Sequence, residues 1–143
     1  MYDIMLVDDE KGVRNSIKAK IDWEAAGFRV VSEASSANEA LQLLEQGPLP
    51  QLLISDIRMP QMDGIEFIRI CKTKYPLLRT VVLSGYSDFD YLKSAIQLGV
   101  KDYLLKPVAR AELNELLGKL AEEIRQEQQK NCRPHGRLCC RKK

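Results

Sequence analysis

The stretch LLISDIRMPQMDG (residues 52–64) decides the fold, because it joins an apolar run to an acidic loop that leads into a helical pattern. Its first part, Leu52–Ser55, is short and nearly continuously apolar, which is typical of a strand buried on both faces of a sheet. After the loop, apolar residues from Ile65 to Cys71 recur every three or four positions, as in an amphipathic helix. The stretch therefore predicts a buried strand with Asp56 at its carboxyl end, followed by a helix.

The same strand-and-helix unit recurs on both sides of this stretch. Four more short apolar runs predict strands: Ile4–Val7, Phe28–Val31, Thr80–Leu83 and Asp102–Leu105. Helical spacing of apolar residues marks the segments 13–21, 37–44, 89–96 and 113–124. Gly and Pro residues follow several of these segments, where they commonly end helices. Five such units predict a doubly wound α/β fold, in which helices cover both faces of a five-stranded parallel sheet.

Composition fits a single soluble domain with a tail. The chain has 143 residues, of which 45% are hydrophobic and 29% charged, and these values exclude wholesale disorder. No apolar run approaches the roughly 20 residues of a membrane span. The first run stops at Asp8, so we expect no signal peptide, no membrane association and a cytoplasmic location.

Charge is unevenly placed along the chain. The net charge is +2, but residues 131–143 contain five Lys and Arg and no acid. Without these five, 17 basic residues face 20 acidic ones, so residues 1–130 carry −3. Because nucleic-acid binding depends on neutralising phosphates, this balance argues against direct DNA binding by the body of the protein.

The last residues depart from the pattern of the rest. We expect a domain over residues 1–125, the end of the last helix or a linker over 126–130, and a disordered or non-native tail over 131–143. Cys132, His135, Cys139 and Cys140 have the chemical types of zinc ligands, but their spacing fits no zinc module. Three of the four cysteines lie in this tail, so no disulfide framework spans the body.

Polar residues follow four of the predicted strands. They are Asp8, Asp9 and Glu10 after the first, Asp56 at the third, Ser84 at the fourth and Lys106 at the fifth. Ligands of parallel sheets bind beyond the carboxyl ends of the strands, so we expect these side chains to meet at one edge. Clustered carboxylates repel one another, and Mg²⁺, a hard cation that prefers oxygen ligands, relieves the repulsion.

A phosphoryl group would complete this cluster. Its oxygens bind a divalent cation, a lysine ammonium such as Lys106 and a hydroxyl such as Ser84. Asp56 is the most central carboxylate, and aspartate is a known nucleophile that forms acyl phosphates. The cluster therefore predicts a phosphorylatable aspartate beside Mg²⁺.

Four motifs carry a family resemblance: LVDDE (6–10), DIRMPQMDG (56–64), LSGY (83–86) and DYLLKPV (102–108). In this order and spacing, the chain resembles a response-regulator receiver domain of two-component signalling over about residues 2–125. The resemblance implies a flavodoxin-like three-layer fold with strand order 2-1-3-4-5. Two further stretches, IDWEAAGF (21–28) and LSGYSDFDY (83–91), resemble receivers that precede AraC-type helix-turn-helix domains.

The resemblance also implies residue roles. Asp8, Asp9, Asp56 and the backbone carbonyl of Arg58 would bind Mg²⁺, Asp56 would be phosphorylated, and Ser84 and Lys106 would contact phosphoryl oxygens. Ser84 and Tyr103 would form the switch. Arg58 and Tyr86, two residues after Asp56 and Ser84, are bulky enough to predict slow loss of the phosphoryl group.

The implied function is phosphoryl transfer from the phosphohistidine of a sensor histidine kinase to Asp56. The domain would catalyse its own phosphorylation and dephosphorylation without being a turnover enzyme. It would switch a transcription domain that this chain lacks, so it would meet DNA only through that domain, and phosphorylation would permit a homodimer.

Three other functions fit parts of the same pattern. A haloacid-dehalogenase-type phosphohydrolase also uses an Asp nucleophile and Mg²⁺, but it usually needs a second acid where Arg58 stands. A flavodoxin-type cofactor binder would need a phosphate-binding loop where Asp8–Glu10 stand. A pseudo-receiver typically loses the acids or the lysine, all of which are present here.

Overall fold

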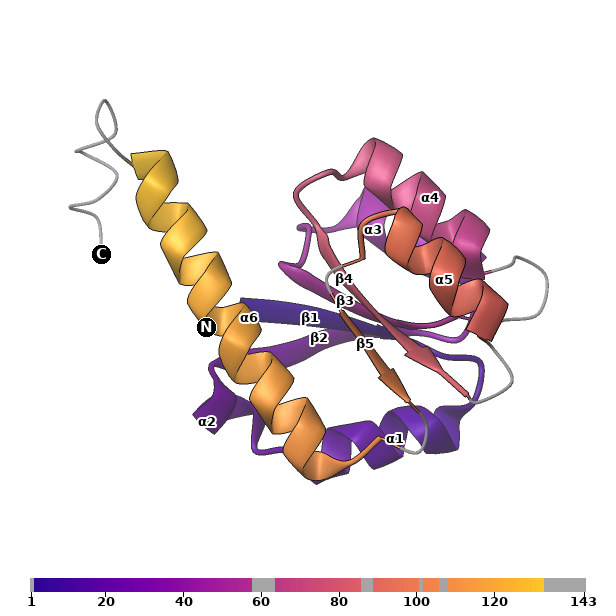
Figure 1. The fold of residues 1–143 in the computed structure, drawn as a ribbon, viewed down its shortest axis with the longest axis horizontal. Coiled ribbons are helices and arrows are strands. Elements are labelled where there is room, and N and C mark those ends of the chain that lie inside the picture. The colour runs from indigo at the N-terminus through magenta and orange to yellow at the C-terminus, as the bar shows by residue number, and fades with distance from the viewer. Residues whose placement is uncertain (1, 58–63, 86–88, 101, 106–107, 133–143) are drawn as a thin grey trace.

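A computed structural model describes residues 2–57, 64–85, 89–100, 102–105 and 108–132. Five strands alternate with helices along the chain (Figure 1). The elements are β1 (Tyr2–Val7), α1 (Lys11–Lys20), α2 (Trp23–Ala26), β2 (Phe28–Ala34), α3 (Ala37–Gln46), β3 (Leu52–Asp56), α4 (Gly64–Lys74), β4 (Arg79–Ser84), α5 (Phe89–Gln97), β5 (Asp102–Leu105) and α6 (Arg110–Cys132).

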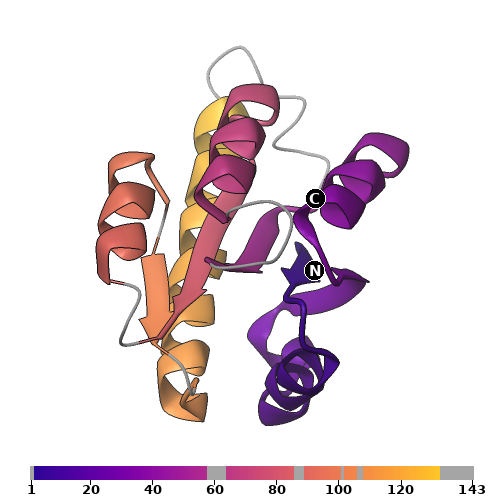
Figure 2. The ribbon, with the colours of Figure 1, turned by 90° about the vertical axis from the view of Figure 1, so that its right-hand side faces the viewer.

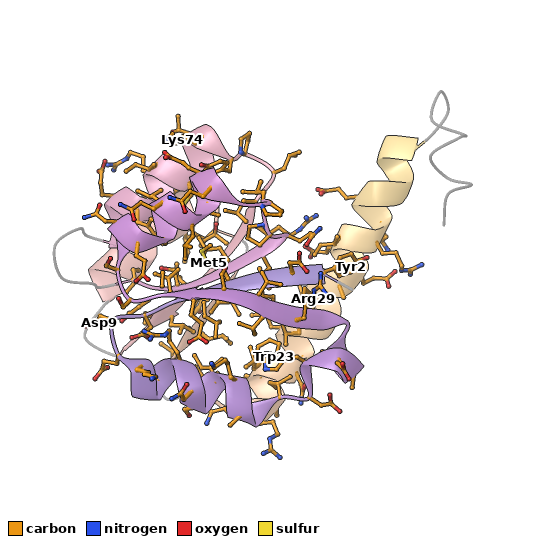
Figure 3. The ribbon with its side chains drawn as sticks, turned by 180° about the vertical axis from the view of Figure 1, so that it is seen from behind. Tyr2, Met5, Asp9, Trp23, Arg29 and Lys74 are labelled. Atoms are coloured by element: carbon orange, nitrogen blue, oxygen red, sulfur yellow. The ribbon has the colours of Figure 1, made fainter. Side chains whose placement is uncertain are left out.

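The strands form one parallel sheet in the order β2-β1-β3-β4-β5. This confirms the predicted fold class and strand order. Figure 2 shows β5 (orange) and β2 (purple) at opposite sides of the sheet. Helices α3, α4 and α5 cover one face, and α1, α2 and α6 cover the other (Figures 1 and 3).

Burial on both faces explains the continuous apolar runs. Every residue of β3 is buried, and so is every residue of β4. On one face, Ile4, Ile54 and Val81 belong to the apolar cluster that includes the stripe of α6. On the other face, Met5 and Leu53 pack with residues of α3 and α4. Strands that are covered by helices on both sides have no polar face, as the sequence predicted.

Local capping fixes the ends of two helices. Ser36 caps α3, because its side chain accepts a hydrogen bond from Glu39 N at 3.1 Å. Glu39 in turn accepts from the backbone N–H of Ser35 at 2.8 Å, an arrangement close to a capping box. Asp22 caps α2 through Ala25 N, and Gly27 ends that helix at a φ of 87°.

The structure adds one helix to the predicted elements and extends others, among them β2, which ends three residues later than predicted. The short helix α2 was not predicted, because one turn of helix leaves no periodic stripe in the sequence. Helix α6 continues to Cys132, two residues into the segment expected to be a tail. The remainder of that tail lies outside the described residues.

Candidate functional site

The carboxyl ends of β1, β3 and β4 lie side by side. In the sheet register Val7 is level with Ser55, and Asp56 is level with Leu83. The residue after Val7 is Asp8, so Asp8 and Asp56 occupy neighbouring positions at this edge, with Ser84 on the next strand. The structure therefore brings together three of the site residues that were predicted from the sequence.

Asp56 is the last residue of β3 and is only 6% exposed. The backbone around it is fixed, because Ile57 N donates to Leu83 O at 3.0 Å and Ser55 Oγ donates to Asp56 O at 3.0 Å. Gly64 at the start of α4 lies so close to this backbone that an added Cβ would sit 2.1 Å from Ile57 O. The start of α4 thus lies directly against the backbone of the residue that follows Asp56.

The acidic turn follows β1 directly. Asp8 is 1% exposed, whereas Asp9 and Glu10 are exposed. Carboxylate oxygens of these three residues lie within 4.8 Å of one another. The turn is ordered by two hydrogen bonds, from Asp8 N to Ala34 O at 3.1 Å and from Glu10 N to Asp8 Oδ1 at 2.9 Å. Figure 3 labels Asp9 where β1 passes into α1.

The donor set of this turn fits a hard divalent cation. Three carboxylates at this spacing repel one another unless a cation is shared among them, and oxygen ligands suit Mg²⁺. Among the described residues, the acidic group at this spacing consists of Asp8, Asp9 and Glu10. Glu10 was noted at the turn from the sequence but was not predicted as a ligand, and Asp56 is not a member of this group.

Ser84 ends β4 and is 1% exposed. Within the described part of the chain, its buried Oγ atom has no hydrogen-bond partner. A buried hydroxyl without a partner is costly, and an arriving anionic oxygen would satisfy it. This observation fits a phosphoryl group at the neighbouring Asp56.

Tyr103 lies on β5 and is 41% exposed. Its side chain lines a surface hollow of about 580 Å³ together with residues of α6, among them Glu112, Glu115 and Lys119. The aromatic residue that was predicted to switch therefore faces outward in this structure. Arg58, Tyr86 and Lys106 lie outside the described residues.

One charged network near the site was not anticipated. Arg14 on α1 donates from Nη1 to the carbonyl oxygen of Asp8, and from Nε to Glu33 Oε1 at 3.0 Å. Lys18, one turn later, donates to the other oxygen of Glu33. The hydrogen bond from Lys18, with a smaller contribution from Arg14, lowers the pKa of Glu33 despite its partial burial. The pairing of α1 with β2 leaves no local sequence signal.

Comparison with known families decides the identity of the domain. Residues 4–118 match the family model of the response regulator receiver domain. The chain belongs to this family. Among the described residues, no helix of the receiver is long and apolar enough to cross a membrane.

Relatives of this receiver are regulators of transcription. It is 37% identical over 133 residues to the transcriptional regulatory protein HptR of Staphylococcus aureus, covering 93% of this chain and 52% of the relative. It is 35% identical over 127 residues to the uncharacterized transcriptional regulatory protein YesN of Bacillus subtilis, covering 89% of this chain and 34% of the relative. The chain thus spans about half the length of HptR and a third of YesN.

Solved structures agree with the fold. The receiver domain of AraT, a response regulator from Geobacillus stearothermophilus, matches with a TM-score of 0.83 and 37% identity, covering 89% of this chain and 98% of that one. A two-component transcriptional regulator AraC from Clostridium phytofermentans matches with a TM-score of 0.80 and 36% identity, covering 90% and 98%. These matches confirm the resemblance to AraC-type regulators.

Proposed function

We propose that this receiver accepts a phosphoryl group on Asp56 from the phosphohistidine of a sensor histidine kinase, in a reaction that requires Mg²⁺. The observation that carries the proposal is the position of Asp56, which is buried at the end of β3 between the acidic turn and Ser84. A carboxylate held there by the sheet is oriented for attack, so positioning supplies much of the rate.

Each side chain at the site has a separate role in the transfer. An oxygen of Asp56 attacks phosphorus, the phosphorus–nitrogen bond to the histidine breaks, and the electron pair stays on the imidazole. Ser84 Oγ donates to a phosphoryl oxygen, and Lys106 supplies a positive charge to another. Asp8, Asp9, Asp56 and the carbonyl of Arg58 would hold Mg²⁺, with Glu10 beside them. The cation, when bound, neutralises charge that develops on the phosphoryl oxygens.

Phosphorylation then acts as a switch. A new phosphoryl oxygen at Asp56 draws the hydroxyl of Ser84 toward it, and Tyr103 turns inward from its exposed position. This changes the surface formed by α5, β5 and α6. The receiver is not a turnover enzyme, because the phosphorylated protein is itself the product.

The relatives support a setting for this function. Residues 1–125 form the receiver, 126–130 lead toward an output domain, and the output is DNA-binding regulation of transcription, in the cytoplasm. A phosphorylation-dependent homodimer fits this scheme. Arg58 and Tyr86 follow Asp56 and Ser84 by two residues in the sequence, and because both residue types are bulky we expect slow hydrolysis of the acyl phosphate.

Intact mass tests the proposal. The receiver is incubated with acetyl phosphate and Mg²⁺, beside Asp56→Asn and beside a sample with excess chelator. We expect one phosphoryl adduct on the unmodified protein and none in the other two samples. An adduct of equal yield on Asp56→Asn, or one that survives the chelator, contradicts the proposal.

A further inference from the structure

Arg14 on α1 joins the acidic turn to its surroundings. It lies one turn after Glu10, and its own N–H donates to Glu10 O at 3.2 Å. Its guanidinium donates to the carbonyl oxygen of Asp8, so the residue is bonded to both ends of the turn. The side chain is only 12% exposed, which is unusual for an arginine and shows that it is packed into this position.

Glu33 holds the guanidinium in place. Its Oε1 accepts from Arg14 Nε at 3.0 Å while its Oε2 accepts from Lys18. Glu33 lies on β2 level with Leu6 of β1, two residues before Asp8, so the contact links α1 and β2 beside the turn. Hydrogen bonds between charged groups are stronger than neutral ones, and this chain of contacts runs from β2 through Arg14 to Asp8.

Hydrogen bonds to two atoms of Asp8 fix the orientation of this residue. The Asp8 carbonyl is bound by Arg14, and its Oδ1 accepts from Glu10 N at 2.9 Å. With the peptide group and the carboxylate both fixed, Asp8 is held in one geometry before any ligand arrives. Metal ligands that are preorganised by a second layer of contacts bind more tightly.

We propose that Arg14, oriented by Glu33, is a positioning residue that sets the geometry of Asp8 for cation binding. Because this role concerns the cation of the proposed function, it rests on that function. Arg14 touches neither the cation nor the phosphoryl group in this scheme, and it acts through Asp8.

The positioning role and simple electrostatics predict opposite changes in cation affinity when Arg14 is removed. A guanidinium beside a cation site repels the cation, so if only its charge mattered, removing it would tighten binding. If Arg14 positions Asp8, removing it weakens binding instead. Loss of second-layer contacts of this kind typically weakens metal binding by about 10-fold or more.

Mn²⁺ is a suitable probe, because it takes the same hard oxygen ligands and its free ion is counted by electron paramagnetic resonance. The dissociation constant is measured for the whole chain and for Arg14→Gln, Arg14→Lys and Glu33→Gln. We expect weakening of about 10-fold for Arg14→Gln and less for Arg14→Lys, which keeps the charge and can make one of the two contacts. The dissociation constant of Glu33→Gln should lie between those of the two Arg14 variants and that of the unmodified protein.

Lys18→Met is the matched control. It removes one positive charge from the same helix and one contact of Glu33, but it leaves both contacts of Arg14. We expect its dissociation constant to stay within about twofold. Thermal unfolding without metal shows which variants are folded, and Arg14→Lys and Glu33→Gln keep the test open if Arg14→Gln is not.

The outcomes separate the two levels of the proposal. Unchanged or tighter binding by Arg14→Gln refutes the positioning role and leaves the metal site intact. Equal weakening by Lys18→Met also refutes it, because both contacts of Arg14 remain in that variant. Failure of the unmodified protein to bind Mn²⁺ contradicts the metal site itself, and with it the role of Arg14.

Discussion

Gly64 offers the sharpest structural prediction. A Cβ at this position would lie 2.1 Å from Ile57 O, 2.5 Å from Ile57 C and 2.8 Å from Ile57 Cα. All three are backbone atoms, so no side chain can rotate away to make room. To reach even 3.0 Å, the start of α4 must move by about 1 Å relative to the residue that follows Asp56.

The destabilisation expected at Gly64 can be compared with the effect of the same substitution at a second glycine. Overpacking of this kind destabilises by about 1–3 kcal/mol, and a backbone clash belongs at the upper end. Gly118 lies inside α6, and a Cβ there meets nothing within 4 Å. Replacing a helical glycine by alanine at such a site stabilises by about 0.5–1 kcal/mol. The same substitution should therefore have opposite signs at the two positions.

Urea unfolding measures both. With a slope of about 1–2 kcal/mol per molar, a loss of about 2 kcal/mol lowers the midpoint of Gly64→Ala by about 1–2 M. Gly118→Ala should raise it by a few tenths of a molar. Gly64→Ala should also be phosphorylated more slowly by acetyl phosphate, because the displaced backbone is next to Asp56. A midpoint for Gly64→Ala at or above that of the unmodified protein would refute the packing argument.

Three further predictions concern charge and burial. Glu127→Gln should destabilise by about 1 kcal/mol in urea unfolding, because the buried Arg79 loses its ionic partner at 2.5 Å while water screens the half-exposed carboxylate of Glu127. Glu122→Gln on the same helix should stay within about 0.5 kcal/mol. Because the pKa of Glu33 is lowered in the folded protein, its ionised carboxylate stabilises the fold at pH values above the unfolded pKa near 4.5. This stabilisation is lost as the pH falls through the folded pKa. The urea midpoints of Glu33→Gln and the unmodified protein should therefore converge on acidification from pH 6. Burial raises the pKa of Cys71 to about 12, so mass spectrometry after a brief thiol reagent at pH 8 should find it unmodified until denaturant is added.

Much of the fold and part of the site were accessible from the sequence. Buried parallel strands read as short apolar runs, and β1, β3, β4 and β5 match the predicted positions to within two residues. Once the strands are placed, the topology rule alone brings Asp8, Asp56 and Ser84 to one edge of the sheet. These three residues could therefore be predicted as neighbours from the order of the strands.

The remainder depends on contacts between elements that are distant in sequence. The pairing of Arg14 with Glu33 joins α1 to β2, and no spacing rule predicts which acid a long arginine side chain reaches. Arg79 is a second example. In the sequence, a charged residue at the first position of β4 indicates the end of a strand rather than a buried residue. The structure shows it 7% exposed and paired with Glu127 of α6. Such pairings are set by tertiary packing rather than by local pattern.

Mapping the phosphorylated residue tests the central claim most directly. The protein is treated with acetyl phosphate and Mg²⁺, reduced with sodium borohydride, which converts an aspartyl phosphate to homoserine, and then digested and sequenced by tandem mass spectrometry. The account predicts homoserine at position 56, with Asp8, Asp9 and Glu10 unchanged. Homoserine at position 8 or 9, with aspartate retained at 56, would contradict it.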